Sequence, residues 1–171
     1  QPASLIRKNL QETAFFFPQL QTDSTGVVII SFTIPEALTR WKLLGFAHTT
    51  DLQYGMITKE LVTQKDFMVI PNAPRFFREG DQLSFTAKVT NLSNEDLSGT
   101  ATLQLFDAIS MRPVDAPFEN SNPVIKFSAA KHQSSALTWM IKIPEGIEAV
   151  SYRVMATSGQ QSDGEENILP V

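Results

Sequence analysis

The chain has 171 residues, of which 42% are hydrophobic and 19% are charged, and its formal net charge at pH 7 is −4. This composition predicts a folded globular protein and excludes a disordered chain, and no apolar run approaches the roughly 20 residues of a membrane span. The lack of a basic stripe excludes nucleic acid as a partner, and the lack of cysteines excludes disulfides, thiolate catalysis and a thioester within these residues.

Residues 1–66 predict four strands, which are too few to close a sandwich. Short apolar runs bounded by turn residues predict strands at Phe15–Leu20, Val27–Ile34, Trp41–Thr49 and Met56–Val62. The preceding segment Leu5–Leu10 is ambiguous between a short helix and an extended strand, and we favour the extended form. Because a sandwich needs two sheets that cover each other's apolar face, we infer an incomplete module that takes strands from elsewhere. Unpaired strands should leave an exposed apolar edge near the first two runs.

Residues 67–171 predict a complete β-sandwich. About seven strands, separated by turn signals every 8–12 residues, are typical of an immunoglobulin or fibronectin type fold. Residues 113–123 are interpreted as a polar, proline-bearing loop, and residues 165–171 as the last strand. The residues expected to face inward are Leu83, Phe85, Ala87, Val89, Ala101, Leu103, Leu105, Leu137, Trp139, Ile141, Ile143, Val150, Tyr152, Val154 and Ala156. The fold class is therefore all-β, with two antiparallel sandwich modules.

No constellation of residues predicts catalysis. His48 and His132 have no second histidine at metal-ligand spacing, so we interpret both as surface or turn residues. No Gly-x-Ser-x-Gly elbow and no glycine-rich phosphate loop is present. We therefore expect neither enzymatic activity nor a cofactor or metal.

The acidic run Asp163–Glu166 is the remaining candidate for a site. It has the composition of a calcium ligand set or an acid pair, but it lacks the alternating oxygen ligands of a calcium loop. Gly164 favours a solvated hairpin turn instead. Asn91 begins a glycosylation sequon, Asn-Leu-Ser, a pattern that is common by chance.

Several segments, weak singly, are specific in their order along the chain. They are Arg7, Glu12–Pro18, Thr22–Asp23 with Gly26, Phe32–Trp41, Phe67–Val69, Pro74–Asp81, Asn91–Ser93, Asp163–Glu166 and Leu169–Val171. Together they resemble the alpha-2-macroglobulin family, which includes large protease-trapping proteins, their bacterial relatives and the complement thioester proteins. The family's Cys-Gly-x-Gln thioester sequence is absent here, as the cysteine count requires.

The resemblance implies that this chain is part of the macroglobulin-domain framework of a larger protein, and that it lies after a bait region and before a thioester domain. Residues 1–66 then correspond to the part of a macroglobulin domain that follows an insertion, and residues 67–171 to the complete macroglobulin domain after it. Because the chain opens on Gln1 without an initiator Met, we expect a piece of a longer polypeptide. The function implied is that of a non-catalytic scaffold in a bacterial, exported protease inhibitor of the periplasm or cell surface.

The implied partners are neighbouring macroglobulin and thioester domains, the parent's target proteases and, through the incomplete module, a second copy of the chain. Arg75 and Arg78 follow the proline-rich stretch Ile70–Pro74 and are candidate contacts between the two modules. The alternative function is a fibronectin-like adhesion or carbohydrate-binding module, which would present exposed aromatic residues. An enzyme ranks third, since it would require a pocket of convergent titratable groups.

Overall fold

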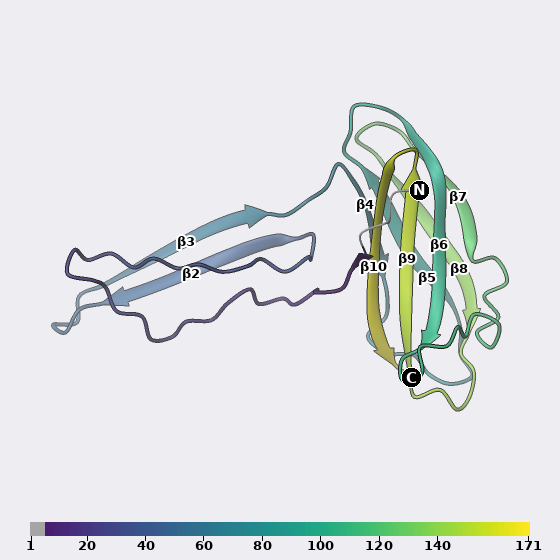
Figure 1. The fold of residues 1–171 in the computed structure, drawn as a ribbon, viewed down its shortest axis with the longest axis horizontal. Helices are drawn as coiled ribbons and strands as arrows, with labels where there is room; N and C mark the ends of the chain where they lie inside the picture. The colour runs from purple at the N-terminus through teal and green to yellow at the C-terminus, as the bar shows by residue number, and fades with distance from the viewer. Residues whose placement is uncertain (1–5) are drawn as a thin grey trace. The chain divides into compact units, whose positions relative to one another are not determined.

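The computed structural model describes residues 6–171, and these form β-strands without any helix that could cross a membrane (Figure 1). The all-β fold class is confirmed. The described residues divide into two compact units, which we treat separately: the sandwich unit, residues 6–8 and 65–171, and the hairpin unit, residues 9–64. The short strand β1 (Ile6–Arg7) belongs to the sandwich unit because it pairs in parallel with β10.

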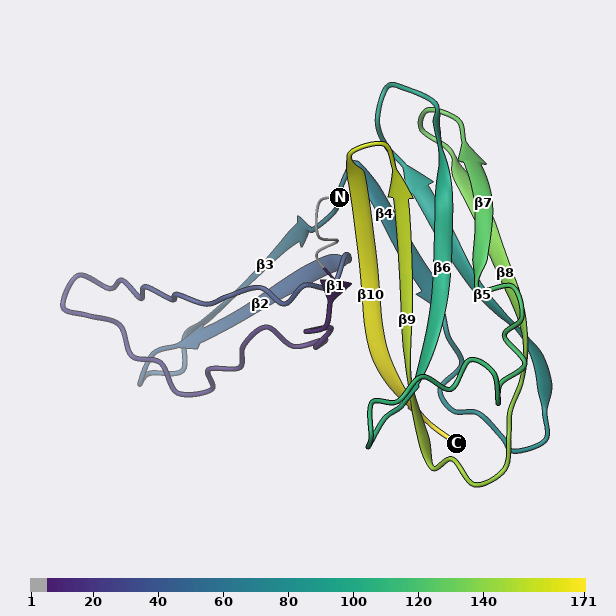
Figure 2. The ribbon, with the colours of Figure 1, turned by 45° about the vertical axis from the view of Figure 1, so that its right-hand side comes forward.

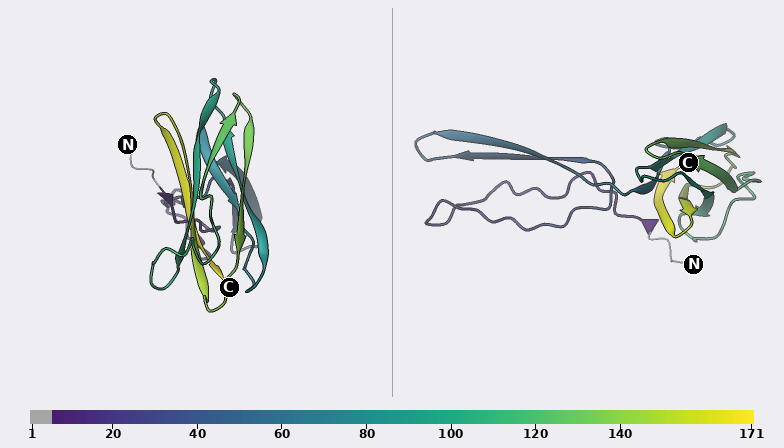
Figure 3. Two further views of the ribbon diagram at one scale, coloured as in Figure 1. Left: turned by 90° about the vertical axis from the view of Figure 1, so that its right-hand side faces the viewer. Right: turned by 90° about the horizontal axis from the view of Figure 1, so that it is seen from above.

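The sandwich unit has the seven strands expected from the sequence, with β1 added at one edge. They are β4 (Phe67–Asn72), β5 (Gln82–Asn91), β6 (Leu97–Asp107), β7 (Val124–Ala129), β8 (Ser134–Lys142), β9 (Ala149–Ser158) and β10 (Gln161–Pro170). One sheet has the order β1-β10-β9-β6-β7 and the other β4-β5-β8. Figures 2 and 3 show the two sheets as facing layers. Apart from β1, every strand in both sheets pairs antiparallel with its neighbours.

Strict alternation along the strands builds the core between these layers. In β8, for example, Leu137, Trp139 and Ile141 are buried while the residues between them are exposed. Successive side chains of a strand point to opposite faces, so one face of each sheet is apolar. The inward-facing residues expected from the sequence are buried, except that Leu83 is only partly so. Phe85 contacts Trp139 edge-on across the β5–β8 pair, with ring centroids 6.5 Å apart.

The loop between β6 and β7 contributes more to this core than its polar composition indicates. Val114 and Phe118 are buried in the core, and the amide of Lys142 donates to the carbonyl of Phe118. The polar residues instead hold the loop: Asn120 donates to the carbonyl of Leu103 and to Asp115. The loop is thus partly exposed but contributes two apolar side chains to the core.

Asn91, the first residue of the sequon, serves the fold. Its side chain is fully buried, and its amide donates to the carbonyls of Glu95, Ala129 and Ala130. Its carbonyl oxygen accepts from the amide and hydroxyl of Ser93. Asn91 therefore joins the turn after β5 to the turn after β7.

The hairpin unit contains a single antiparallel pair, β2 (Arg40–His48) with β3 (Tyr54–Val62). Both strands agree with the sequence-based prediction. The strands expected at Phe15–Leu20 and Val27–Ile34 are wrong, because these residues have no ladder partner in the described chain. Apolar alternation favours a strand only where a neighbouring strand supplies hydrogen bonds. Phe16 and Ile29 remain 79% and 88% exposed, consistent with the expected exposed apolar edge.

Candidate functional site

The acidic run that sequence analysis placed in a solvated turn lies within strand β10. The hairpin turn instead falls earlier, at Gly159, whose φ of 57° suits a tight turn. Asp163 is fully buried, so the prediction of a solvated turn was wrong. Because β10 alternates, Asp163 and Glu165 share one face of the strand and Glu166 lies on the other.

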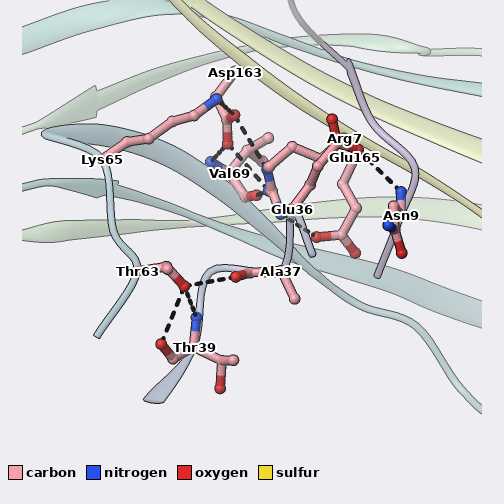
Figure 4. A network of polar contacts seen from close by, with 10 residues as sticks. All are labelled: Arg7, Asn9, Glu36, Ala37, Thr39, Thr63, Lys65, Val69, Asp163 and Glu165. Carbon is pink, nitrogen blue, oxygen red and sulfur yellow. Dashed lines mark hydrogen bonds and ion pairs between the residues drawn. The ribbon is translucent and has the colours of Figure 1, made fainter. Parts of the chain in front are cut away.

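Asp163 accepts hydrogen bonds at both carboxylate oxygens from three segments of the sandwich unit (Figure 4). Arg7 of β1 donates through Nε to Oδ1 at 3.3 Å and through Nη2 to Oδ2 at 3.1 Å. Lys65 donates to Oδ1 at 2.6 Å, and the amide of Val69 donates to Oδ2 at 2.9 Å. The arrangement is a two-pronged arginine–carboxylate pair reinforced by an ammonium and a backbone amide, which is among the stronger kinds of hydrogen bonding.

Arg7 is held from three directions. Its side chain is 3% exposed, and Nη2 also donates to the carbonyl of Val69 at 2.7 Å while Nη1 binds Glu165 at 3.0 Å. Burial raises the pKa of Glu165, and the positive charge of Arg7 opposes that rise. Burial, together with the charge of Glu165, also raises the pKa of Tyr152. These groups surround a guanidinium that loses its hydration, and each of its three nitrogens donates at least one hydrogen bond in exchange.

A second ion-pair group lies on the other face of β10, centred on Glu166. Arg153 of β9 donates to Glu166 at 2.7 Å and 2.8 Å, and Lys8 donates to it at 3.1 Å. The guanidinium of Arg153 also lies over the ring of Phe106, 4.9 Å from its centroid. Burial acts to raise the pKa of Glu166, but the hydrogen bonds from Arg153 and Lys8 outweigh it and the pKa is lowered.

This site holds segments together and does not present a reactive group. Both oxygens of Asp163 are occupied by protein donors, so the carboxylate has no free position aimed at a substrate. A general base needs to reach a substrate proton within hydrogen-bond distance. The chemistry that the cluster supports is mechanical: it fixes β1 and the segment before β4 to β10.

The two segments whose basic side chains bind Asp163 are the ones that connect the sandwich unit to residues 9–64. Within the hairpin unit, the corresponding ends of the chain are also tied by polar contacts, shown in Figure 4. Asn9 and Glu36 exchange hydrogen bonds, with the Asn9 amide 3.0 Å from the Glu36 carboxylate and the Glu36 amide 2.8 Å from the Asn9 carbonyl. The hydroxyl of Thr63 donates to the carbonyl of Ala37 at 2.7 Å. The indole of Trp41 donates to the same hydroxyl at 3.0 Å.

The remaining candidates from the sequence lie elsewhere. Arg75 and Arg78 are exposed in the connection between β4 and β5, and neither side chain forms an ion pair among residues 6–171. Their role as contacts between modules stays a prediction. His48 and His132 are exposed at turns, where His48 lies 3.2 Å from the carbonyl of Thr49 and His132 lies 3.1 Å from the side chain of Asn94.

Sequence reasoning missed Arg7 and Lys65 as members of a site. Each is one basic residue in an unremarkable context, and Asp163 is 156 residues from Arg7 in the chain. The available signal was the spacing of the acids. Asp163 and Glu165 are two residues apart, as expected for one face of a strand, and a buried acidic face requires basic partners.

Comparison with known proteins identifies the family. The model of the alpha-2-macroglobulin family matches residues 13–103, more than half of the chain. The chain belongs to the alpha-2-macroglobulin family. The alpha-2-macroglobulin of Thermotoga maritima is 25% identical over 166 residues, which are 97% of this chain and 10% of that protein. This chain therefore spans about a tenth of the length of that alpha-2-macroglobulin.

Solved alpha-2-macroglobulin structures share the fold. A crystal structure of a Salmonella alpha-2-macroglobulin mutant aligns with a TM-score of 0.55 and 16% identity, covering 89% of this chain and 10% of that one. The native conformation of the Escherichia coli protein aligns with a TM-score of 0.54 and 15% identity, covering 89% of this chain and 9% of that one. The chain thus has the fold of a portion of a bacterial alpha-2-macroglobulin.

Proposed function

We propose that this chain is a non-catalytic structural segment of a bacterial, exported alpha-2-macroglobulin that traps proteases. Family membership supports the proposal, and the observation that carries it is the uncovered apolar surface of the hairpin unit. Leu44, Phe46 and Met56 are 67%, 64% and 73% exposed on the two paired strands. A lone two-stranded hairpin is marginally stable in water, so we expect further strands to pack against this surface and cover it.

In this proposal the rest of the same polypeptide supplies those strands, and the neighbouring macroglobulin and thioester domains are the immediate partners. Target proteases are partners of the whole protein and do not bind this segment alone. The sandwich unit, with its closed core, provides a rigid body that transmits movement between reactive regions outside the chain. The periplasm or the cell surface is the compartment where such an inhibitor meets foreign proteases.

The test uses the longer polypeptide that contains this chain. A protease enclosed by a large inhibitor still cleaves small peptides but loses activity on protein substrates, so both activities are measured after incubation. Phe46→Asp and Met56→Asp should abolish the difference between the two substrates, because they place charges where strands must pack. Lys59→Asp is the matched control, because it changes a residue of β3 that already carries a charge. Absence of protease retention by the unmodified polypeptide would refute the proposal.

Arg75 and Arg78 enter the proposal as contacts to neighbouring modules. Both are exposed beside the proline-bearing end of β4, where the backbone has little freedom. Replacing both by alanine should alter the small-angle scattering curve and the melting temperature of the protein. Unchanged scattering and melting would remove these residues from the proposal.

One observation favours the alternative function of carbohydrate binding. Phe46 stacks with Tyr54 at 6.2 Å between ring centroids and lies 5.9 Å from the ring of His48, and all three side chains are exposed. Exposed aromatic rings are a common platform for sugars. Binding on a glycan array that is lost in Tyr54→Ala would favour this function, whereas an array without binding would leave packing against further strands as the explanation.

A further inference from the structure

Two peptide connections join the hairpin unit to the sandwich unit, one after Lys8 and the other before Lys65. Both connections lead to the same carboxylate within the sandwich unit. Asp163 binds Arg7 at 3.1 Å, one residue before the first connection, and Lys65 at 2.6 Å, at the second. One side chain of β10 therefore holds two segments that the whole hairpin unit separates in sequence.

The first of these segments is short, and ion pairs provide much of its attachment to β10: Arg7 binds Asp163 and Glu165, and Lys8 binds Glu166. Within residues 6–171, strand β1 is two residues long and pairs with Gly164 and Glu165 of β10. Backbone pairing of this length is far shorter than the usual strand of about five or six residues. Arg7 contributes the buried contacts, since its guanidinium reaches Asp163, Glu165 and the carbonyl of Val69.

We propose that Asp163 is a latch that fixes both connections of the hairpin unit at one point on β10. With the latch closed, the two ends of residues 9–64 are held together and cannot move independently. With it open, β1 leaves the edge of β10 and both connections are released at once. A buried ion pair suits this purpose because it contributes modest net stability when complete but strongly disfavours the loss of one partner.

The test is hydrogen–deuterium exchange, followed by mass spectrometry, on the whole chain and on Asp163→Asn. Asparagine keeps the shape of the side chain but removes the charge that pairs with Arg7 and Lys65. Glu119→Gln is the matched control, because it removes an acid from an exposed ion pair of the same unit, with Lys142 at 3.4 Å. Amides of β6 and β9 report on the stability of the whole unit.

In Asp163→Asn we expect exchange to accelerate at least about tenfold in residues 6–8 and in residues 65–69, so that these segments lose most of their protection, whereas β6 and β9 are less stable than before but stay strongly protected. In Glu119→Gln all of these segments should exchange as in the unmodified chain. Unchanged exchange at either connection in Asp163→Asn would overturn the proposal. Loss of protection in β6 and β9 to the same level as at the connections would do so as well, because it would indicate unfolding of the whole sandwich unit.

Lys65→Gln provides a second, milder variant, since this side chain is partly exposed and its loss leaves Arg7 paired. It should accelerate exchange in residues 65–69 and leave residues 6–8 protected. Release of both segments by this variant would contradict the role of Asp163 as the shared anchor. The proposal concerns the sandwich unit and holds whether or not the parent protein traps proteases, so the two tests fail independently.

Discussion

Arg7 and Asp163 form a doubly hydrogen-bonded ion pair, with the side chains 3% and 0% exposed, across 156 residues of sequence. The pair joins the two-residue strand β1 to the last strand of the sandwich. The pair thus links a segment that precedes the hairpin unit in the sequence to a strand that follows it.

A double-mutant cycle measures how this pair contributes to stability. Arg7→Met and Asp163→Leu should each lower the free energy of unfolding by about 3–5 kcal/mol, because each removes the doubly hydrogen-bonded partner of a buried charge. The double variant should lose less than the sum of the two single losses. Urea unfolding followed by the fluorescence of Trp139, in a Trp41→Phe background, gives all four values. Additive losses would contradict the pairing.

Gly99 in β6 is required by close packing against β9. A Cβ atom at this position would overlap the carbonyl oxygen of Thr157. Gly99→Ala should therefore destabilise the sandwich unit by about 1–3 kcal/mol or more, since the backbone must shift. Gly55→Ala is the control because nothing lies near the Cβ built there. Equal melting temperatures for the two variants would refute the packing argument.

Asn91 should be as important to folding as a core residue. Replacing it with alanine removes the donor to the carbonyls of Glu95 and Ala129 and leaves buried polar groups without partners. We expect a loss of about 1–3 kcal/mol per unsatisfied buried group. Thermal unfolding of Asn91→Ala tests this, with Asn94→Ala as a control at a more exposed position in the same turn. A loss no larger than that of the control would contradict the prediction.

Neighbouring glutamates of β10 should show opposite dependences on pH. The lowered pKa of Glu166 means that its carboxylate stabilises the fold above the unfolded pKa of about 4.3, and that this stability is lost as pH falls through the folded pKa. The raised pKa of Glu165 has the opposite sign, so its contribution is lost as pH rises from about 4.3 through the folded pKa.

Chemical unfolding of Glu165→Gln and Glu166→Gln between pH 3 and pH 7 separates the two. The free energy of unfolding of the unmodified chain minus that of Glu166→Gln should increase as the pH rises. The corresponding difference for Glu165→Gln should decrease. The same sign of pH dependence for both variants would contradict the assignment of the two faces of β10.

The sandwich unit should fold without the hairpin unit. Because Arg7 and Lys65 both reach Asp163, a flexible linker of about six residues should span the ends when residues 9–64 are deleted. The shortened chain should keep the melting temperature of the sandwich unit and lose the tendency of exposed apolar strands to self-associate. Calorimetry and light scattering measure both properties. A shortened chain that does not fold would show that the hairpin unit completes the core.

The sequence by itself determined the seven strands of the sandwich and most of its core, because alternation in strands such as β8 reflects a local rule: successive side chains point to opposite faces. It also determined β2 and β3, and the order of short motifs that indicates the family. Tertiary structure alone decided the rest. The apolar runs at 15–20 and 27–34 form no strands because pairing depends on a partner that local pattern does not specify.

The same reason explains the site. An acidic run that contains glycine has the local signature of a turn, and only the return of Arg7 and Lys65 to β10 makes burial of Asp163 favourable. A charge enters a protein interior when its partners are already placed there, and those partners come from distant parts of the chain. Composition and periodicity therefore predicted the strands of the sandwich, whereas long-range pairing of charges attaches the edge strand β1 to β10.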